Sequence, residues 1–172
     1  MSQTIQKKVC MVGVFGTGKT SLVQRFVHTL FSERYLSTVG VKIDRKPLEL
    51  DGTALTLVLW DLAGRDKHED VAGSYLRGAH AVLYVADGTR RETCDQLPEL
   101  RALAREAAGD VPGVLALNKS DLKDSWALAQ KDEELLAREW DLVRTSAKTG
   151  DGVEEAFRRI GRATLAGREA RP

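Results

Sequence analysis

Four residues near the N-terminus have the types and spacing of a phosphate-binding turn. The stretch GVFGTGKTS places Gly13, Gly18, Lys19 and Thr20 in the order G-x-x-x-x-G-K-T, between an apolar run and a helical pattern. Glycines let backbone N–H groups converge on phosphate oxygens, and a helix N-terminus adds partial positive charge. Lys19 would reach the outer phosphates of a nucleotide, and the Thr20 hydroxyl would bind Mg²⁺. We expect the site to comprise Gly16, Thr17, Gly18, Lys19, Thr20 and Ser21; a glycine-rich turn without a ligand is the alternative.

Two further motifs, LNKSDL and TSAKTG, indicate which nucleotide such a site selects. Asn118, Lys119 and Asp121 stand at the end of an apolar run, where open α/β sheets bind ligands. The Asp121 carboxylate only accepts hydrogen bonds, which suits the N1–H and 2-amino donors of guanine. Adenine offers no such pair, and a site of this kind can reject an analogue by roughly 10⁴-fold. We therefore expect guanine, which argues against a P-loop ATPase or kinase.

The stretch DLAGRDKHED puts Asp61 at the end of a strand-like run, where a phosphate-bound Mg²⁺ would need a carboxylate. Arg65 is a large cation close to the place where a water would have to be activated. His68 follows as a conceivable general base, but nothing nearby fixes its tautomer, so a solvated loop histidine is the preferred interpretation.

Alternating apolar and amphipathic segments must position these motifs. Buried strands are expected at KKVCMVGV, AHAVLYVAD and VPGVLALN, with a short strand at LVRTS. VKIDRKPLEL and ALTLVLW flank Asp51-Gly52, a two-residue hairpin signal. Helical patterns cover Thr20 to about Leu30, Leu97–Ala107, about Ser125 to Glu139, and about 152–167. This pattern predicts one domain over 1–172, an α/β fold with a mostly parallel sheet covered on both faces.

Composition excludes several classes of protein. The 172 residues are 42% hydrophobic and 30% charged, and the net charge of +1 favours neither nucleic acid nor an anionic membrane. No stretch approaches the ~18 apolar residues of a membrane span. Cys10 and Cys94 lack metal-type spacing, and Cys10 is expected to be a buried reduced thiol, which fits a cytoplasmic location.

In combination and order these motifs resemble the Ras-like small GTPases over essentially the whole chain. YLSTVGVKID, LELDG, LWDLAG, SYLRGAH and EEAFRRI are most similar to the Rab branch. The resemblance implies a three-layer P-loop NTPase fold: a six-stranded, mostly parallel sheet with one antiparallel edge hairpin, and five helices on both faces. It also implies GTP/GDP and Mg²⁺ binding, GTP hydrolysis, and switch loops at about 31–43 and 61–78 that respond to the γ-phosphate.

The resemblance further assigns roles to single residues. Phe31 would lie against guanine and Tyr35 near the phosphates, while Thr38 would ligate Mg²⁺ and sense the γ-phosphate. Asp61 would hold Mg²⁺ through a water, and the Gly64 N–H would meet the γ-phosphate. The implied base pocket comprises Asn118, Lys119, Asp121, Ser146, Ala147 and Lys148. The implied catalytic group comprises Lys19, Thr38, Gly64 and Arg65.

Ile43, Trp60 and Tyr75 match the apolar cluster that Rab proteins present to effectors, although Ile43 replaces the usual Phe. A core position for Trp60 is the alternative, since strand alternation puts Leu55, Leu57 and Leu59 on one face and Thr56, Val58 and Trp60 on the other. An exchange factor and a GTPase-activating protein are further implied partners. We expect a monomer that binds no nucleic acid.

Two residues depart from the family pattern. Arg65 replaces the glutamine that orients the attacking water, and a guanidinium has no acceptor for that water. Weakened hydrolysis is therefore predicted; two alternatives stay open, that Arg65 helps in cis with transition-state charge and that neither departure affects hydrolysis. Phe15 stands where Ras has Gly and many Rabs have Ser, and its ring would crowd the entry of an activating arginine. We predict intrinsic turnover on the order of 10⁻⁴ s⁻¹ or slower; the alternative is a nucleotide-bound scaffold that never turns over usefully.

The chain ends bear on membrane attachment. Ser2 stands where N-myristoylation needs glycine, and AGREARP contains no cysteine for a prenyl group. No stable membrane anchor is therefore expected on this chain. Either a prenylated tail is missing, or the source cell, for example a prokaryote, uses such proteins without lipid.

Overall fold

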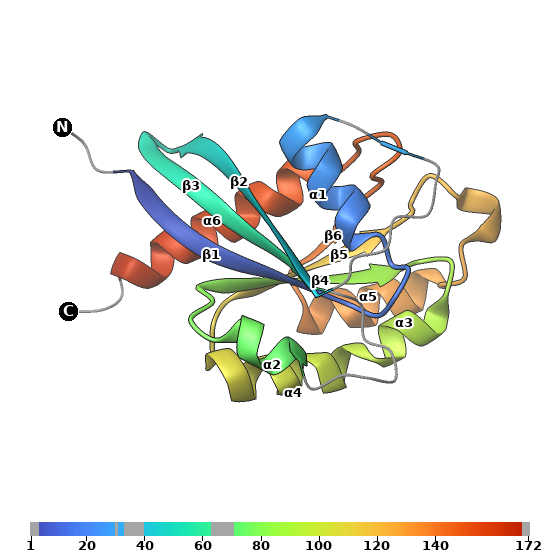
Figure 1. Cartoon of the computed structure of the whole chain (residues 1–172). Coiled ribbons are helices and arrows are strands. Elements are labelled where there is room, and N and C mark those ends of the chain that lie inside the picture. The colour runs from blue at the N-terminus through green and yellow to red at the C-terminus, as the bar shows by residue number, and fades with distance from the viewer. Residues whose placement is uncertain (1–3, 30, 33–39, 63–70, 170–172) are drawn as a thin grey trace.

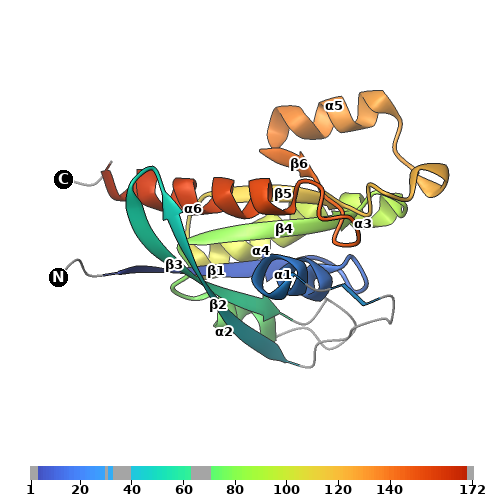
Figure 2. The same ribbon diagram turned by 90° about the horizontal axis from the view of Figure 1, so that it is seen from above.

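The computed structural model describes residues 4–29, 31–32, 40–62 and 71–169. Its strands form one mixed sheet in the order β2-β3-β1-β4-β5-β6, and Figure 2 shows them side by side. Strands β2 and β3 are antiparallel, whereas every other neighbouring pair is parallel. The bounds are β1 Ile5–Val12, β2 Val41–Leu50, β3 Thr53–Leu62, β4 Ala81–Asp87, β5 Gly113–Asn118 and β6 Leu142–Arg144. The predicted six-stranded sheet with one antiparallel edge hairpin is confirmed.

Helices cover both faces of this sheet (Figure 1). Helices α1 and α6 lie on one face, and α2, α3, α4 and α5 lie on the other. Their bounds are α1 Lys19–His28, α2 Val71–Leu76, α3 Arg91–Asp95, α4 Leu97–Ala108, α5 Gln130–Glu139 and α6 Val153–Glu169, with a 3₁₀ turn at Lys123–Ser125. The result is the predicted three-layer α/β architecture.

Side chains of each central strand alternate between two apolar cores. In β1, Val9 and Met11 join the core under α1 and α6, whereas Cys10 and Val12 join the core on the other face. This alternation follows from the two-residue repeat of a strand. Cys10 and Cys94 are both buried free thiols, which confirms the prediction for Cys10.

The edge hairpin turns at Asp51 and Gly52, whose φ angles are 50° and 82°. Two consecutive positive φ values are those of a type I′ turn, the turn that matches the twist of the flanking strands. Along β3, Leu55, Leu57 and Leu59 are buried and the residues between them are only partly so, as alternation predicted.

The start of one helix differs clearly from the predicted start. Helix α5 begins at Gln130 rather than near Ser125, because Trp126 leaves the helical region with ψ 124°. The following Ala127 N–H donates to the Gly88 carbonyl at 2.8 Å, and a Cβ on Gly88 would collide with the Trp126 ring. Tertiary packing of the tryptophan therefore overrides local helix propensity.

The described residues form six α-helices where the resemblance implied five, and the helical segment after β4 is divided into α3 and α4. Pro98 in the first turn of α4 has no N–H to donate to the Cys94 carbonyl, and the Gln96 N–H takes that carbonyl instead. The break falls at Gln96 for this reason.

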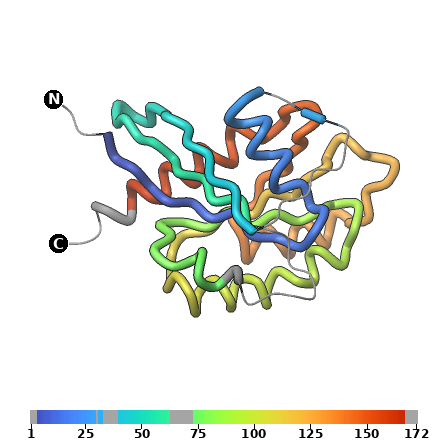
Figure 3. The backbone as a smooth tube through the Cα atoms, viewed as in Figure 1, coloured from blue at the N-terminus to red at the C-terminus, as the bar shows by residue number. Residues whose placement is uncertain are grey.

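The loops that follow β1, β5 and β6 meet at one end of the sheet, opposite the end at which β1 begins (Figure 3). This end is where the carboxyl termini of the parallel strands converge, the usual ligand side of an open α/β sheet. Within the described ranges, none of the helices combines the length and apolarity needed to cross a membrane.

Candidate functional site

Close backbone approaches explain the glycines of the turn after β1. A Cβ on Gly13 would collide with the Val85 carbonyl of the neighbouring strand β4. Gly18 has φ 100°, and a Cβ there would meet the Asn118 side-chain amide. Gly18 also caps α1 without a side-chain hydrogen bond. The first turn of α1 thus presents backbone N–H groups at the C-terminal end of the sheet, an arrangement suited to an anion.

Lys19 is buried inside this turn, with 6% of its surface exposed. Its Nζ donates to the carbonyls of Gly13 at 2.9 Å and Val14 at 3.2 Å. Burial lowers the pKa of Lys19 to about 8, while the nearby Asp61 carboxylate acts in the opposite direction. A buried ammonium of this kind gains much from a phosphate anion placed beside it.

The Thr20 hydroxyl donates to the Asp61 Oδ2 atom at 2.6 Å. Asp61 lies at the C-terminal end of β3 and is fully buried. A hydroxyl and a carboxylate are hard oxygen ligands of the type that Mg²⁺ prefers, and here they lie beside the phosphate turn. The residues present therefore fit a divalent cation.

The two base-recognition motifs lie against the phosphate turn. The Asn118 Nδ2 donates to the Thr17 carbonyl at 3.0 Å, and the Lys119 Nζ donates to the Gly16 carbonyl at 3.0 Å. The hydroxyl of Thr145, the first residue of TSAKTG, donates to the Asn118 Oδ1 at 3.0 Å. Loops from three separate strands are thereby fixed to one another.

Asp121 is held by the second motif. The Ser146 hydroxyl donates to the Asp121 Oδ1 at 2.8 Å and itself accepts from the Thr149 N–H at 3.1 Å. Ser146 and Ala147 are buried, whereas Lys148 is exposed. The carboxylate predicted to read guanine is thus oriented by a residue of the loop predicted to close the base pocket.

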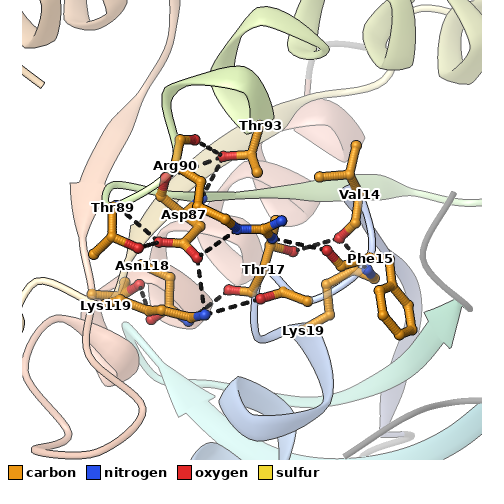
Figure 4. A network of polar contacts seen from close by, with 12 residues as sticks. Val14, Phe15, Thr17, Lys19, Asp87, Thr89, Arg90, Thr93, Asn118 and Lys119 are labelled. Carbon is orange, nitrogen blue, oxygen red and sulfur yellow. Dashed lines mark hydrogen bonds and ion pairs between the residues drawn. The ribbon is translucent and has the colours of Figure 1, made fainter. Parts of the chain in front are cut away.

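Sequence reasoning missed Asp87, a fully buried carboxylate at the end of β4. It accepts from the Thr89 N–H at 2.8 Å and the Thr89 hydroxyl at 2.6 Å, and pairs with the Lys119 Nζ at 2.9 Å (Figure 4). Burial alone would raise the pKa of Asp87, but these hydrogen bonds from Thr89 and Lys119 hold it below its ordinary value. The available signal was an acidic residue at the carboxyl end of the apolar run AHAVLYVAD.

Comparison with known proteins decides the family. The model of the Ras family matches residues 8–166. The chain belongs to the Ras family.

The chain is similar in sequence to several Rab proteins. Ras-related protein Rab-1 of Theileria annulata is 35% identical over 160 residues, which cover 91% of this chain and 73% of that protein. Ras-related protein Rab-8B of Homo sapiens is 32% identical over 158 residues, 90% of this chain and 76% of that protein. Ras-related protein RABD2a of Arabidopsis thaliana is 35% identical over 153 residues, 87% and 75% respectively. The chain is therefore a Rab-branch small GTPase, which binds guanine nucleotide and hydrolyses GTP to GDP.

Several site residues predicted from the Ras-family pattern fall outside the described residues: Tyr35, Thr38, Gly64 and Arg65, as does His68. Of the first switch loop, Phe31 is described and is 37% exposed. Phe15 is 49% exposed, so its ring does not pack into the core of this GTPase. Its backbone carbonyl faces Arg90, which donates to it at 2.9 Å (Figure 4).

The residues of the candidate effector cluster lie next to one another, but Trp60 and Tyr75 are partly buried and pack against the core on the α2 side of the sheet, so the core alternative for Trp60 holds in part. Ile43 of β2 pairs with Trp60 of β3 in the antiparallel register and is 42% exposed. The centroids of the Trp60 and Tyr75 rings lie 6.2 Å apart, and the rings are tilted by 50° to each other. Lys8 covers the Trp60 ring at 3.7 Å, so the tryptophan is only partly available.

Proposed function

We propose that the chain works as a single-domain switch that binds GTP or GDP with Mg²⁺ and hydrolyses GTP slowly. The observation that carries this proposal is the joining of the phosphate turn to the base loops through Asn118–Thr17 and Lys119–Gly16. These contacts bring the phosphate and base motifs within one nucleotide's reach of each other. A guanine nucleotide uses both groups, since its phosphates suit an anion cradle and its N1–H and 2-amino donors suit an acceptor-only carboxylate.

Separate groups of residues bind the phosphates, the base and the cation. Backbone N–H groups of the turn and the Lys19 ammonium bind the β- and γ-phosphates. Asp121 accepts from guanine, and Ser146 keeps its carboxylate in that orientation. Thr20 and Asp61 would hold Mg²⁺, directly and through a water respectively. Bound Mg²⁺ supplies positive charge at the β- and γ-phosphate oxygens.

Arg65 stands where a water-orienting glutamine is usual, and its guanidinium lacks the acceptor that such a water needs. The exposed Phe15 ring next to the cradle adds bulk on the side from which an activating arginine would come. Both features favour a long-lived GTP state. The second candidate, a nucleotide-bound binding module with no useful turnover, draws its support from the same two residues.

In this proposal the GTP state is read by effectors through the loops at about 31–43 and 61–78. Ile43, Trp60 and Tyr75 supply the apolar part of that surface, which is continuous across β2, β3 and α2. Because Ile43 is smaller than the usual Phe, the surface suits a partner with a shallower apolar contact.

The test is nucleotide content and competition. The purified protein is denatured, its released nucleotide is identified by chromatography, and a fluorescent GDP analogue is then displaced by GTP, GDP or ATP. We expect guanine nucleotide to co-purify and ATP not to compete at millimolar concentration. Asp121→Asn should weaken GDP binding by at least about tenfold. The matched control is Asp124→Asn, the same change in the exposed 3₁₀ turn, which should bind like wild type. Efficient competition by ATP would overturn the proposal.

A further inference from the structure

We propose that Arg90 is a positioning residue of the phosphate turn: it holds the Phe15–Gly16 peptide so that the Gly16 N–H faces the nucleotide phosphates. The inference rests on the proposed function, since it assigns Arg90 a part in phosphate binding at that site. Arg90 lies in the loop between β4 and α3 and belongs to none of the motifs that the sequence displays.

One planar group of Arg90 makes two contacts. Its Nη2 donates to the Phe15 carbonyl at 2.9 Å, and its Nε donates to the Asp87 Oδ2 at 3.2 Å (Figure 4). Asp87 is fully buried and is fixed by Thr89 and Lys119. Because the guanidinium is rigid, a fixed Asp87 determines where the Phe15 carbonyl is held.

The orientation of that carbonyl determines the orientation of the next N–H. In a trans peptide the C=O of one residue and the N–H of the next point in opposite directions, and no cis peptide occurs in the described part of the chain. A carbonyl drawn toward Arg90 therefore turns the Gly16 N–H to the opposite side of the turn. Gly16 has φ 80°, a conformation that glycine adopts without strain.

Arg90 completes a continuous series of donors to the turn. Lys19 holds the carbonyls of Gly13 and Val14. Lys119 holds the carbonyl of Gly16, and Asn118 holds that of Thr17. Phe15 lies between these two sets, and Arg90 is the residue that holds its carbonyl. Each of five consecutive carbonyls from Gly13 to Thr17 thus accepts a hydrogen bond from a side chain, so the intervening N–H groups are oriented before a nucleotide arrives.

The neighbouring Arg91 is a matched control. It carries the same charge one position further along, but its guanidinium pairs with Asp132 of α5 at 3.3 Å. Arg90→Ala and Arg91→Ala therefore make equal changes in net charge, while only the first removes a contact to the phosphate turn.

The experiment loads wild type and both variants with GDP and Mg²⁺. The release rate of a fluorescent GDP analogue is measured by stopped flow, and the β-phosphate of bound GDP is observed by ³¹P NMR. We expect Arg90→Ala to release GDP about tenfold faster, the effect of losing one charge-assisted hydrogen bond, and to shift the β-phosphate resonance. Arg91→Ala should match wild type in both measurements.

Three results would overturn the inference. Arg90→Ala could keep the wild-type release rate and β-phosphate resonance, or both variants could speed release equally, which would mark an effect of charge alone. A lower unfolding temperature for Arg90→Ala with an unshifted resonance would mark a purely structural role. Failure of the wild type itself to bind GDP would instead overturn the proposed function, so the two failures are distinguishable.

Discussion

The Thr20 hydroxyl and the Asp61 carboxylate lie 2.6 Å apart although they come from different elements. Parallel pairing of β1 with β3 explains the contact, because Met11 is in register with Asp61 and the phosphate turn starts directly after β1. A helix that begins at Lys19 then places the hydroxyl of its second residue over the end of β3. The two oxygen ligands are therefore brought together by sheet register and helix start.

Thr20→Ala should weaken the effect of Mg²⁺ on nucleotide release. The variant loses the hydroxyl ligand while Asp61 stays in place, so Mg²⁺ should slow GDP release much less than in wild type. Release of a fluorescent GDP analogue with excess Mg²⁺ or with EDTA measures this ratio. Thr53→Ala, which removes the same hydroxyl at the start of β3, is the control. An unchanged ratio for Thr20→Ala would exclude this residue from the cation site.

GDP affinity should fall as the pH rises above about 8. The buried Lys19 has a pKa of about 8 in the nucleotide-free protein against 10.5 in an unfolded chain, whereas phosphate binding requires the charged form. The association constant should then fall by about fivefold between pH 8 and 9, as the charged fraction of Lys19 decreases. Lys19→Arg stays charged and should show a flatter profile, with guanine's own titration affecting both proteins alike. Parallel pH profiles of GDP affinity for wild type and Lys19→Arg would contradict the assignment of this pH dependence to Lys19.

The same pKa shift predicts a rise in the stability of the nucleotide-free protein with pH. Between pH 8 and 10.5 the unfolded chain carries the proton on Lys19 more often than the folded chain does. The free energy of unfolding therefore gains a favourable contribution from Lys19 as the pH increases through this window. Urea unfolding of wild type and Lys19→Met across these pH values measures the free energy of unfolding. The increase with pH that Lys19 contributes should be absent in the variant.

Arg65→Gln should speed hydrolysis of bound GTP by at least about tenfold from a wild-type rate on the order of 10⁻⁴ s⁻¹ or slower, because an amide provides the missing acceptor. Single-turnover hydrolysis with Mg²⁺ measures the rate. Phe15→Ser tests the second departure from the family pattern. Arg77→Gln, at an exposed position after α2, is the control for the loss of one positive charge. If wild type hydrolyses readily and Arg65→Gln slows it, the arginine is catalytic.

Phe157→Ala should destabilise the protein by about 3–5 kcal/mol. Phe157 of α6 is fully buried and its ring stacks on that of Phe26 in α1, with centroids 4.1 Å apart. Urea unfolding with saturating GDP measures the free energy of unfolding. Leu135→Ala on α5, where the side chain is 56% exposed, should change it by no more than about 0.5 kcal/mol. Equal effects of the two changes would argue against the α1–α6 contact as a main source of stability.

Local patterns were enough to predict the strands and the hairpin. The alternation in β3 and the Asp51-Gly52 pair both encode their structure within a few residues, and both are confirmed. The motifs around Lys19 and Asn118 were likewise visible, because their residue types and spacing are specific. Their joining by the Asn118–Thr17 contact follows from the strand order, which places β1 and β5 on either side of β4.

Contacts between segments that are distant in the sequence could not be predicted from local patterns. The start of α5 depends on Trp126 packing against Gly88, and no periodicity in the local sequence encodes that contact. Arg90 reads as one of many surface arginines until the fold puts it beside Phe15. Asp87 could be placed at a strand end, and its partners Thr89 and Arg90 follow within three residues, but its ion pair with the distant Lys119 forms only in the folded chain.

The contact between Gly88 and Trp126 also constrains how this sequence can diverge. The indole ring occupies the space that any side chain at position 88 would need, and the backbone N–H of Gly88 is bonded to the Asn118 carbonyl at 3.0 Å, so the glycine cannot easily move away. Among descendants that keep this loop, a larger residue at position 88 should appear only together with a smaller one at position 126. The two positions are expected to covary although they lie on different segments, and a lineage that replaced one alone would disturb the loop that carries the guanine-reading motif.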